Sequence, residues 1–236
     1  MKKLDSLSIF FPFWNEGKNI ENVVNSAIPI AEKVAGEWEI LIIDDGSSDN
    51  TLEKAEQLAK KNPNIRVITH SPNRGYGAAL KEGFENAKYG VIVFTDGDGQ
   101  FDFSEVDRLI EKIDESDMVI GYRKKRQDNL IRHILMNMLK IWDRIFFGFL
   151  FKDIDCGFKM IKKEALTEIM PLRSEGAMIT TEILAKAVRK KLKITQVEVS
   201  HYPRKYGNQS GANIPVIVRA VLESLILWWD LRNKRI

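Results

Sequence analysis

Two carboxylates stand close together directly after a short apolar run in the first half of the chain. Asp96 and Asp98 lie two residues apart in the stretch FTDGDGQF, which follows the run GVIV. Side chains at positions i and i+2 of an extended segment point the same way, so both carboxylates can converge on one point. Because like charges repel unless a cation or a proton lies between them, the pattern predicts a site for a divalent cation.

A hard cation such as Mg²⁺ or Mn²⁺ suits this stretch. Mg²⁺ takes one or two carboxylates and fills its remaining positions with water and phosphate oxygens. Gln100 adds an amide oxygen as a further candidate ligand, and Gly97 lets a ligand approach the backbone closely. The competing interpretation is a polar turn in which the two aspartates cap local backbone groups.

The elements that must position this site alternate along the first half of the chain. Short β-branched and aromatic runs predict strands at residues 7–13, 38–43, 65–69 and 91–94, and apolar residues recur between them at helical spacing. This alternation predicts a parallel sheet covered by helices on both faces. Ligands of such sheets bind beyond the carboxyl ends of the strands. We therefore expect the site at that edge.

The second half is less regular. Strands are predicted at residues 117–121, 156–161 and 193–199, and helices at about 129–149, 180–190 and 213–231. No internal repeat or low-complexity linker separates the two halves. We therefore predict one compact α/β domain with an appended second half.

Composition narrows the class of protein. The chain has 236 residues, of which 44% are hydrophobic and 29% charged, as in an ordinary globular domain. The net charge of +3 excludes a general affinity for nucleic acid, and the single Cys156 excludes an internal disulfide and suits a reducing compartment. With no signal peptide and no run of about 18 apolar residues, we expect a protein that does not cross a membrane.

Six stretches of the sequence together resemble glycosyltransferase family 2. In chain order they are FPFWNEGKNI, IIDDGSSDNT, NRGYGAALKEG, FTDGDGQF, DIDCGFKM and TTEIL. The pattern is most similar to that of the polyprenyl-phosphate sugar transferases, among them dolichyl-phosphate mannose synthase. The resemblance implies a GT-A fold with a mostly parallel sheet flanked by helices, a nucleotide-diphosphate sugar donor and inversion at the anomeric carbon. It implies one domain over residues 1–236, in which 1–121 bind the donor and 122–236 the acceptor.

The family pattern also implies which residues bind the donor. These are Pro12, Trp14, Glu16, Ile43, Asp45, Arg74, Asp96, Gly97, Asp98, Gln100, Arg123 and Arg204. Trp14 would lie beside the base or ribose, and Asp45 would accept a hydrogen bond from a ring N–H. The donor would be of the GDP-mannose or UDP-glucose type.

The same resemblance implies a catalytic group of Asp98, Arg123, Arg204, Asp155 and Glu182. Asp96, Asp98 and Gln100 would hold Mg²⁺ or Mn²⁺ against the two phosphates. The two arginines would lie around those phosphates, because guanidinium groups fit phosphate oxygens.

The acceptor side would include Arg132, Asp153 and Lys159. A hydroxyl acceptor must lose a proton, for which Asp153, Asp155 and Glu182 are the candidate bases. A dolichyl or undecaprenyl phosphate arrives as an anion and needs cations instead, and Arg132 would hold it. We expect the lipid phosphate. The alternatives are a saccharide or other hydroxyl acceptor, and a catalytically inactive nucleotide-sugar-binding module.

Two segments combine basic and apolar residues. Residues 122–152 carry a net charge of +6 and many apolar residues, and residues 226–235 place two tryptophans next to basic side chains. Such segments indicate a helix that lies on a membrane surface, although a core helix with a solvated face or a homodimer interface explains them as well. We expect a cytoplasmic protein in peripheral contact with the cytoplasmic face of the membrane.

Overall fold

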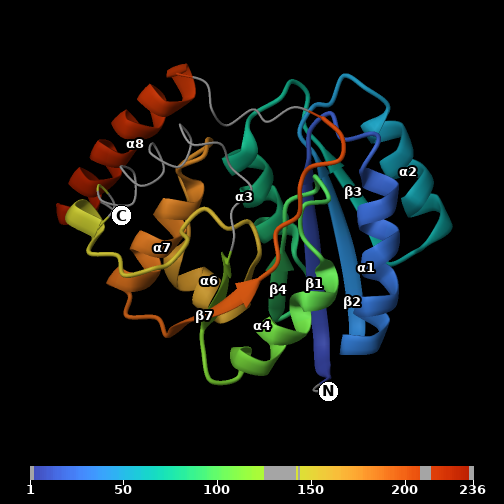
Figure 1. The fold of residues 1–236 in the computed structure, drawn as a ribbon, viewed down its shortest axis with the longest axis horizontal. Coiled ribbons are helices and arrows are strands. Elements are labelled where there is room, and N and C mark those ends of the chain that lie inside the picture. Colours follow the sequence, from blue (N-terminus) through green and yellow to red (C-terminus); the bar gives the residue numbers. More distant parts are fainter. Residues whose placement is uncertain (1–2, 125–141, 143, 208–213, 234–236) are drawn as a thin grey trace.

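A seven-stranded sheet runs through the middle of the part of the chain that the structure describes (Figure 1). In this computed structural model the described residues are 3–124, 142, 144–207 and 214–233, with backbone alone described for 214–221. The strands are β1 (Leu4–Phe13), β2 (Ala35–Asp44), β3 (Ile65–Thr69), β4 (Val91–Phe94), β5 (Met118–Arg123), β6 (Lys159–Lys162) and β7 (Ile194–Val199). Their order across the sheet is β3-β2-β1-β4-β6-β5-β7.

The sheet is mostly parallel, as predicted. β1 pairs in parallel with β2 and β4, β2 with β3, and β5 with β7. β6 alone among these strands is antiparallel, and it lies between β4 and β5. The apolar pattern gave the place of β6 along the chain but not its direction, because a fully buried strand has the same pattern in either direction. The sheet joins strands from both halves of the chain; the single-domain assignment stays a prediction.

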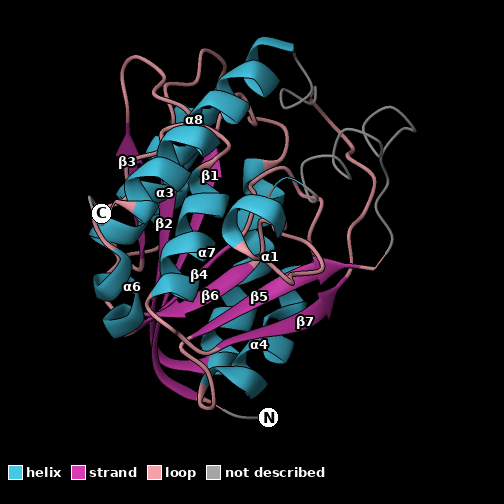
Figure 2. Ribbon diagram, turned by 90° about the vertical axis from the view of Figure 1, so that its left-hand side faces the viewer, coloured by secondary structure: helices cyan, strands magenta, loops and turns pink. Residues whose placement is uncertain are grey.

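Helices cover both faces of the sheet (Figures 1 and 2). One face packs against α1 (Ile20–Val34), α2 (Thr51–Lys61), a 3-10 turn (Phe103–Glu105) and α4 (Val106–Ile113). The other packs against α3 (Tyr76–Asn86), α6 (Lys163–Ile169) and α7 (Ile179–Arg189). α8 (Ile214–Arg232) lies outside α7. Of the predicted helix at residues 129–149, most lies outside the described residues.

Alternation along β1 builds the two core layers. Ile9 and Phe11 point into the layer with α1 and α4, whereas Phe10 points into the layer with α3. Phe10 stacks on Phe94 and meets the edge of Phe84, with ring centroids 5.1 Å apart in both pairs. Successive side chains of a strand point to opposite faces, so one buried strand supplies both layers.

The contact of α3 with Phe10 generates a prediction. A Cβ at Gly83 would lie 2.4 Å from Cδ2 of Phe10, whose ring is held between two other rings. We expect Gly83→Ala to lower the free energy of unfolding by about 1–3 kcal/mol, the usual cost of overpacking a core. Urea unfolding followed by circular dichroism measures this. Gly90→Ala is the control, because no atom lies within 4 Å of a Cβ there. Equal stabilities of the two variants would contradict the packing argument.

Candidate functional site

Loops from distant parts of the chain meet at the carboxyl edge of the sheet. The loop after β7 reaches this edge because the N–H of Tyr202 donates to the carbonyl oxygen of Gln100 at 2.8 Å. That loop carries Arg204, whose guanidinium pairs with Glu16 and lies 3.9 Å from Oδ2 of Asp98. The structure therefore brings together Glu16 and Arg204, which are the first and the last charged residues among those predicted to bind the donor.

Asp96 is held from two sides. The hydroxyl of Tyr76, the first residue of α3, donates to Oδ1 of Asp96 at 2.8 Å. The second neighbour is the backbone of Gly157, where a Cβ would come within 2.3 Å of Oδ2. Only glycine leaves room for the carboxylate at this position.

Asp98 is the less enclosed of the two acids, with a side chain 17% exposed. Its Oδ1 accepts the N–H of Gln100 at 3.0 Å. Burial, and then the charge of Asp96, raise the pKa of Asp98 to about 7. Burial also raises the pKa of Asp96, although the Tyr76 hydroxyl and the nearby cations oppose this. The two carboxylates thus repel each other inside a poorly hydrated site.

This donor set fits a hard divalent cation. Among the described residues no group of three or more His, Cys, Asp and Glu side chains could hold a metal ion. A pair of carboxylates that leaves the other positions to water and phosphate oxygens is typical of Mg²⁺ sites. Asp96 and Asp98 are the residues that would hold such an ion, because a cation between them would offset their mutual repulsion.

Gln100 has a structural contact that the sequence did not indicate. Its side-chain Nε2 donates to the carbonyl oxygen of Tyr202 at 2.9 Å, and its backbone accepts from the same residue. Gln100 therefore fastens the loop that carries Arg204. Its role as a metal ligand stays a prediction.

Arg123 is bound to a carboxylate in this structure. Its Nε and one terminal nitrogen donate to the two oxygens of Asp153 at 2.6 and 2.9 Å. Burial alone would lower the pKa of Arg123, but the Asp153 carboxylate outweighs it and raises that pKa. Asp153 was predicted as an acceptor residue or a base; here it neutralises the arginine, and both side chains are more than nine-tenths buried.

The acceptor role predicted for Lys159 is not supported by its position. Lys159 is completely buried, and its ammonium bonds to the carbonyl oxygens of Ile154 and Cys156. Burial lowers the pKa of this group. Lys159 stabilises the loop behind Asp96 and has no surface with which to meet an acceptor.

The position of Glu182 likewise does not favour its predicted catalytic role, which stays a prediction. Glu182 is completely buried in α7, pairs with Lys186 at 2.8 Å and accepts the N–H groups of Arg173 and Ser174. Burial would raise the pKa of Glu182, but these donors outweigh it and lower that pKa. A buried, fully bonded carboxylate with a lowered pKa is a poor base. Asp155, the third candidate base, is half-buried near Arg123.

Asp45 organises the loop after β3. Its carboxylate meets His70 Nδ1, Asn73 Nδ2 and the N–H groups of Arg74 and Gly75, each at 2.8 Å. A carboxylate has about four acceptor positions, so these partners occupy all of them. The predicted bond to a base would need one of them to move, and it stays a prediction.

The other residues predicted to bind the nucleotide differ in their solvent exposure. Trp14 is 47% exposed, and its predicted stacking on the nucleotide stays a prediction, whereas Pro12 is buried at the end of β1. The side chain of Ile43 is completely buried in the core, and its predicted contact with a base stays a prediction. Arg74 is 48% exposed and lies 3.4 Å from Glu82. Arg132 lies outside the described residues.

The sequence of this chain is similar to sequences of known proteins. A family model described as Glycosyl transferase family 2 matches residues 8–170. The chain belongs to glycosyltransferase family 2. It is 33% identical over 222 residues to a dolichyl-phosphate beta-glucosyltransferase of Saccharomyces cerevisiae, covering 82% of this chain and 66% of that protein. It is 26% identical over 219 residues to an undecaprenyl-phosphate 4-deoxy-4-formamido-L-arabinose transferase of Proteus mirabilis, covering 92% of this chain and again 66% of the relative.

The fold of this family 2 chain is shared with solved structures. Glucosyl-3-phosphoglycerate synthase from Mycobacterium tuberculosis, crystallised with Mn²⁺, uridine diphosphate and glucosyl-3-phosphoglycerate, superimposes with a TM-score of 0.73 at 20% identity. The match covers 94% of this chain and 79% of the synthase. The predicted GT-A fold is thereby confirmed. The chain spans just under two thirds of the length of the two relatives above.

Sequence reasoning missed two contacts of this family 2 site. Tyr76 lies in the stretch NRGYGAALKEG, but nothing in the sequence pairs it with Asp96, twenty residues away. The ion pair of Arg123 with Asp153 joins residues thirty apart. The sequence offered only an indirect indication, because Tyr76, Asp96 and Asp153 lie in stretches that resemble the family. Contacts between such stretches appear only when the sheet brings them together.

The raised pKa of Asp98 generates a prediction about stability. An unfolded aspartate has a pKa of about 3.9. Since the folded value is about 7, the folded state keeps a proton that the unfolded state loses, and stability falls as the pH rises from about 4 to about 7. Asparagine does not titrate. We expect Asp98→Asn to be more stable than the parent at pH 8, with a much smaller difference at pH 4.

Thermal unfolding in EDTA measures this, and each kcal/mol corresponds to about 2–4 °C in a chain of this size. Asp5→Asn, at an exposed position on β1, is the control and should show no such trend. If the difference in stability between Asp98→Asn and the parent does not grow with pH, the account of the carboxylate pair is wrong.

Proposed function

We propose that this chain transfers a sugar from a nucleotide-diphosphate sugar to a polyprenyl phosphate, with inversion at the anomeric carbon. The observation that carries the proposal is the buried pair of Asp96 and Asp98 with Arg123 and Arg204 beside it. Relatives whose names include dolichyl and undecaprenyl phosphate support the acceptor class.

The chemistry needs charge compensation more than proton transfer. An oxygen of the lipid phosphate attacks the anomeric carbon, the bond from that carbon to the diphosphate breaks, and its electron pair stays on the leaving oxygen. A bound Mg²⁺ or Mn²⁺ would supply positive charge to the leaving diphosphate. Arg204 would bind a phosphate oxygen in exchange for its contact with Glu16.

The contacts of the three predicted bases favour a phosphate acceptor over a hydroxyl acceptor. A hydroxyl needs a base, and two of the three predicted bases have other roles: Asp153 binds Arg123, and Glu182 is buried in its own network. Asp155 is the remaining candidate. A lipid phosphate is already an anion, so it needs none of them.

A transfer assay tests the proposal. Purified protein is given Mn²⁺, short-chain polyprenyl phosphate and labelled nucleotide sugars, beginning with UDP-glucose and GDP-mannose, and label entering the organic phase is counted. We expect one donor to be used, Asp98→Asn to lose at least about a hundredfold in rate, and Asp155→Asn to keep most of it, because no base is needed.

Loss of turnover in Asp155→Asn with unchanged donor affinity would make the hydroxyl acceptor the better assignment. Donor binding without transfer to any acceptor would favour the inactive binding module.

The membrane contact belongs to the same proposal. Within the described residues no helix combines the length and the apolarity needed to span a bilayer. α8 nevertheless exposes one apolar stripe at helical spacing, namely Leu222, Leu225, Ile226 and Trp229, of which Ile226 is 62% exposed. Its opposite side, with Leu227 and Leu231, is buried. We assign the stripe to an anionic membrane surface, where the lipid acceptor would reside.

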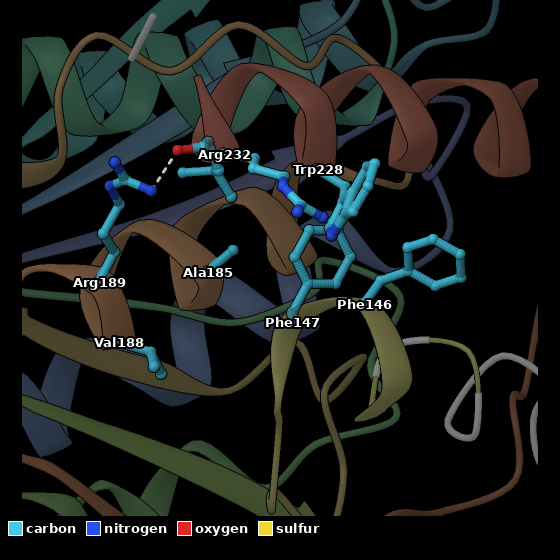
Figure 3. Close-up of a pocket in the computed structure, with 8 residues that line it drawn as sticks. Phe146, Phe147, Ala185, Val188, Arg189, Trp228 and Arg232 are labelled. Atoms are coloured by element: carbon cyan, nitrogen blue, oxygen red, sulfur yellow. Dashed lines mark hydrogen bonds between the residues drawn. The ribbon is translucent and has the colours of Figure 1, made fainter. Parts of the chain in front are cut away.

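The neighbouring helical residues 144–147 extend this region. Phe146 meets the edge of Trp228 at 5.6 Å, and Ile145 beside it is 72% exposed. A cavity of about 240 Å³ lies between these residues, α7 and α8, with Phe147 and Trp228 in its wall (Figure 3). Arg232 lies over the Trp228 ring at 5.2 Å and keeps positive charge at this end of α8. Apolar and cationic groups together suit an anionic bilayer. Because the single cysteine suits a reducing compartment, we place the contact on the cytoplasmic face.

Vesicle binding tests the stripe. The parent should sediment with anionic vesicles at low salt and be released as salt screens the basic residues. Ile226→Ser should bind several-fold more weakly, because it removes apolar contact, and Ile226→Leu should bind like the parent. If Ile226→Ser instead turns a dimer into a monomer and vesicle binding is unchanged, the stripe is a homodimer interface and the membrane assignment fails.

A further inference from the structure

Tyr76 occupies a fixed position at the start of α3. The N–H groups of the next two residues, Gly77 and Ala78, both donate to the carbonyl oxygen of Glu175, at 2.8 and 3.3 Å. A Cβ at Gly77 would lie 2.6 Å from the carbonyl oxygen of Ser174, so the helix start lies directly on this segment. The beginning of α3 therefore cannot shift without moving residues 174–176.

Glu182 holds that segment in place. Its carboxylate accepts the N–H of Ser174 at 2.7 Å and that of Arg173 at 2.9 Å, and it pairs with Lys186 of the same helix. A continuous series of contacts thus runs from α7 through residues 173–176 to Tyr76 and ends at Asp96. This is a use for the buried Glu182 that requires no contact with substrate.

A second support reaches Asp96 from behind. The buried ammonium of Lys159 bonds to the carbonyl oxygens of Ile154 and Cys156 and so fixes the loop that contains Gly157. The backbone of Gly157 lies against the Asp96 carboxylate, where a Cβ would come within 2.3 Å of Oδ2 and 2.6 Å of Oδ1, and the Tyr76 hydroxyl donates to Oδ1. The orientation of Asp96 is therefore set by two separate parts of the fold.

We propose that Tyr76 is a positioning residue which, by holding Asp96, sets the affinity of the carboxylate pair for a divalent cation. The inference rests on the proposed function, because the cation belongs to that same site. A phenol that donates to a metal-ligating carboxylate keeps it in one rotamer. Removing such an outer-shell partner typically weakens metal binding by about 10–100-fold.

The hydroxyl is suited to this task because a phenol is a neutral donor. Tyr76 donates to Oδ1 of Asp96 at 2.8 Å and adds no charge of its own. A lysine here would compete with the cation, whereas a phenol orients the ligand and leaves the site negative.

The test compares Tyr76→Phe with the parent, and Tyr89→Phe is the matched control. Tyr89 lies far from the site, and its hydroxyl accepts a hydrogen bond from the Lys88 ammonium. Mn²⁺ affinity is measured by titration calorimetry in the presence of saturating uridine or guanosine diphosphate, whichever binds, and nucleotide affinity is measured separately in EDTA. We expect Tyr76→Phe to weaken Mn²⁺ by at least about tenfold and to leave nucleotide affinity in EDTA unchanged.

Gly157→Ala is the second variant, since its Cβ would lie 2.3 Å from Oδ2 and displace the Asp96 carboxylate without removing the Tyr76 hydroxyl. It should also weaken Mn²⁺, while Gly90→Ala and Tyr89→Phe should match the parent. If the parent binds Mn²⁺ and both site variants bind it equally well, the positioning role is wrong and the proposed function stands. If the parent binds the nucleotide but no Mn²⁺, the metal part of the proposed function fails and this inference fails with it.

Discussion

The carboxylates of Asp96 and Asp98 must lie side by side, and the arrangement around them follows from that constraint. Burial, and then the negative charge of Asp96, raise the pKa of Asp98 to about 7, so the two carboxylates repel each other in a poorly hydrated site. Every neighbouring element reduces or directs this repulsion. A hydroxyl from α3 and the backbone of Gly157 fix one carboxylate, and Arg204 approaches the other. The fold keeps the pair together although it costs stability, and a bound cation would remove that cost.

The positive charges of the site are largely occupied before any ligand arrives. Arg123 is bound by Asp153, Arg204 is paired with Glu16, and Lys159 is bonded to backbone carbonyls. A diphosphate would have to compete with these carboxylates for the arginines. Specific binding is then an exchange of partners, in which the geometry of the forked guanidinium groups favours phosphate oxygens.

The helices outside the sheet divide the molecule into two kinds of surface. α1, α2 and α4 bury their apolar residues against one face and show polar side chains to solvent. α8 buries Leu227 and Leu231 but leaves Ile226 and Trp229 exposed on its other side. A helix that is apolar on two sides needs a second partner, because exposed apolar area of this size is unfavourable in water. The exposed stripe of α8 therefore lies on a different surface from α1, α2 and α4.

The sequence by itself determined the order of the elements, the edge of the sheet that carries the site and the family. All seven strands and the paired aspartates were predictable, because periodicity and the polar strand ends are local properties. The tertiary structure alone decided how the charged residues are used. Glu182 and Lys159 were predicted to meet the substrates and are buried supports, and Asp153 binds Arg123. Residue type and spacing give the chemistry that a side chain can perform. Burial and partners give the chemistry that it does perform, and both depend on contacts between residues far apart in the chain.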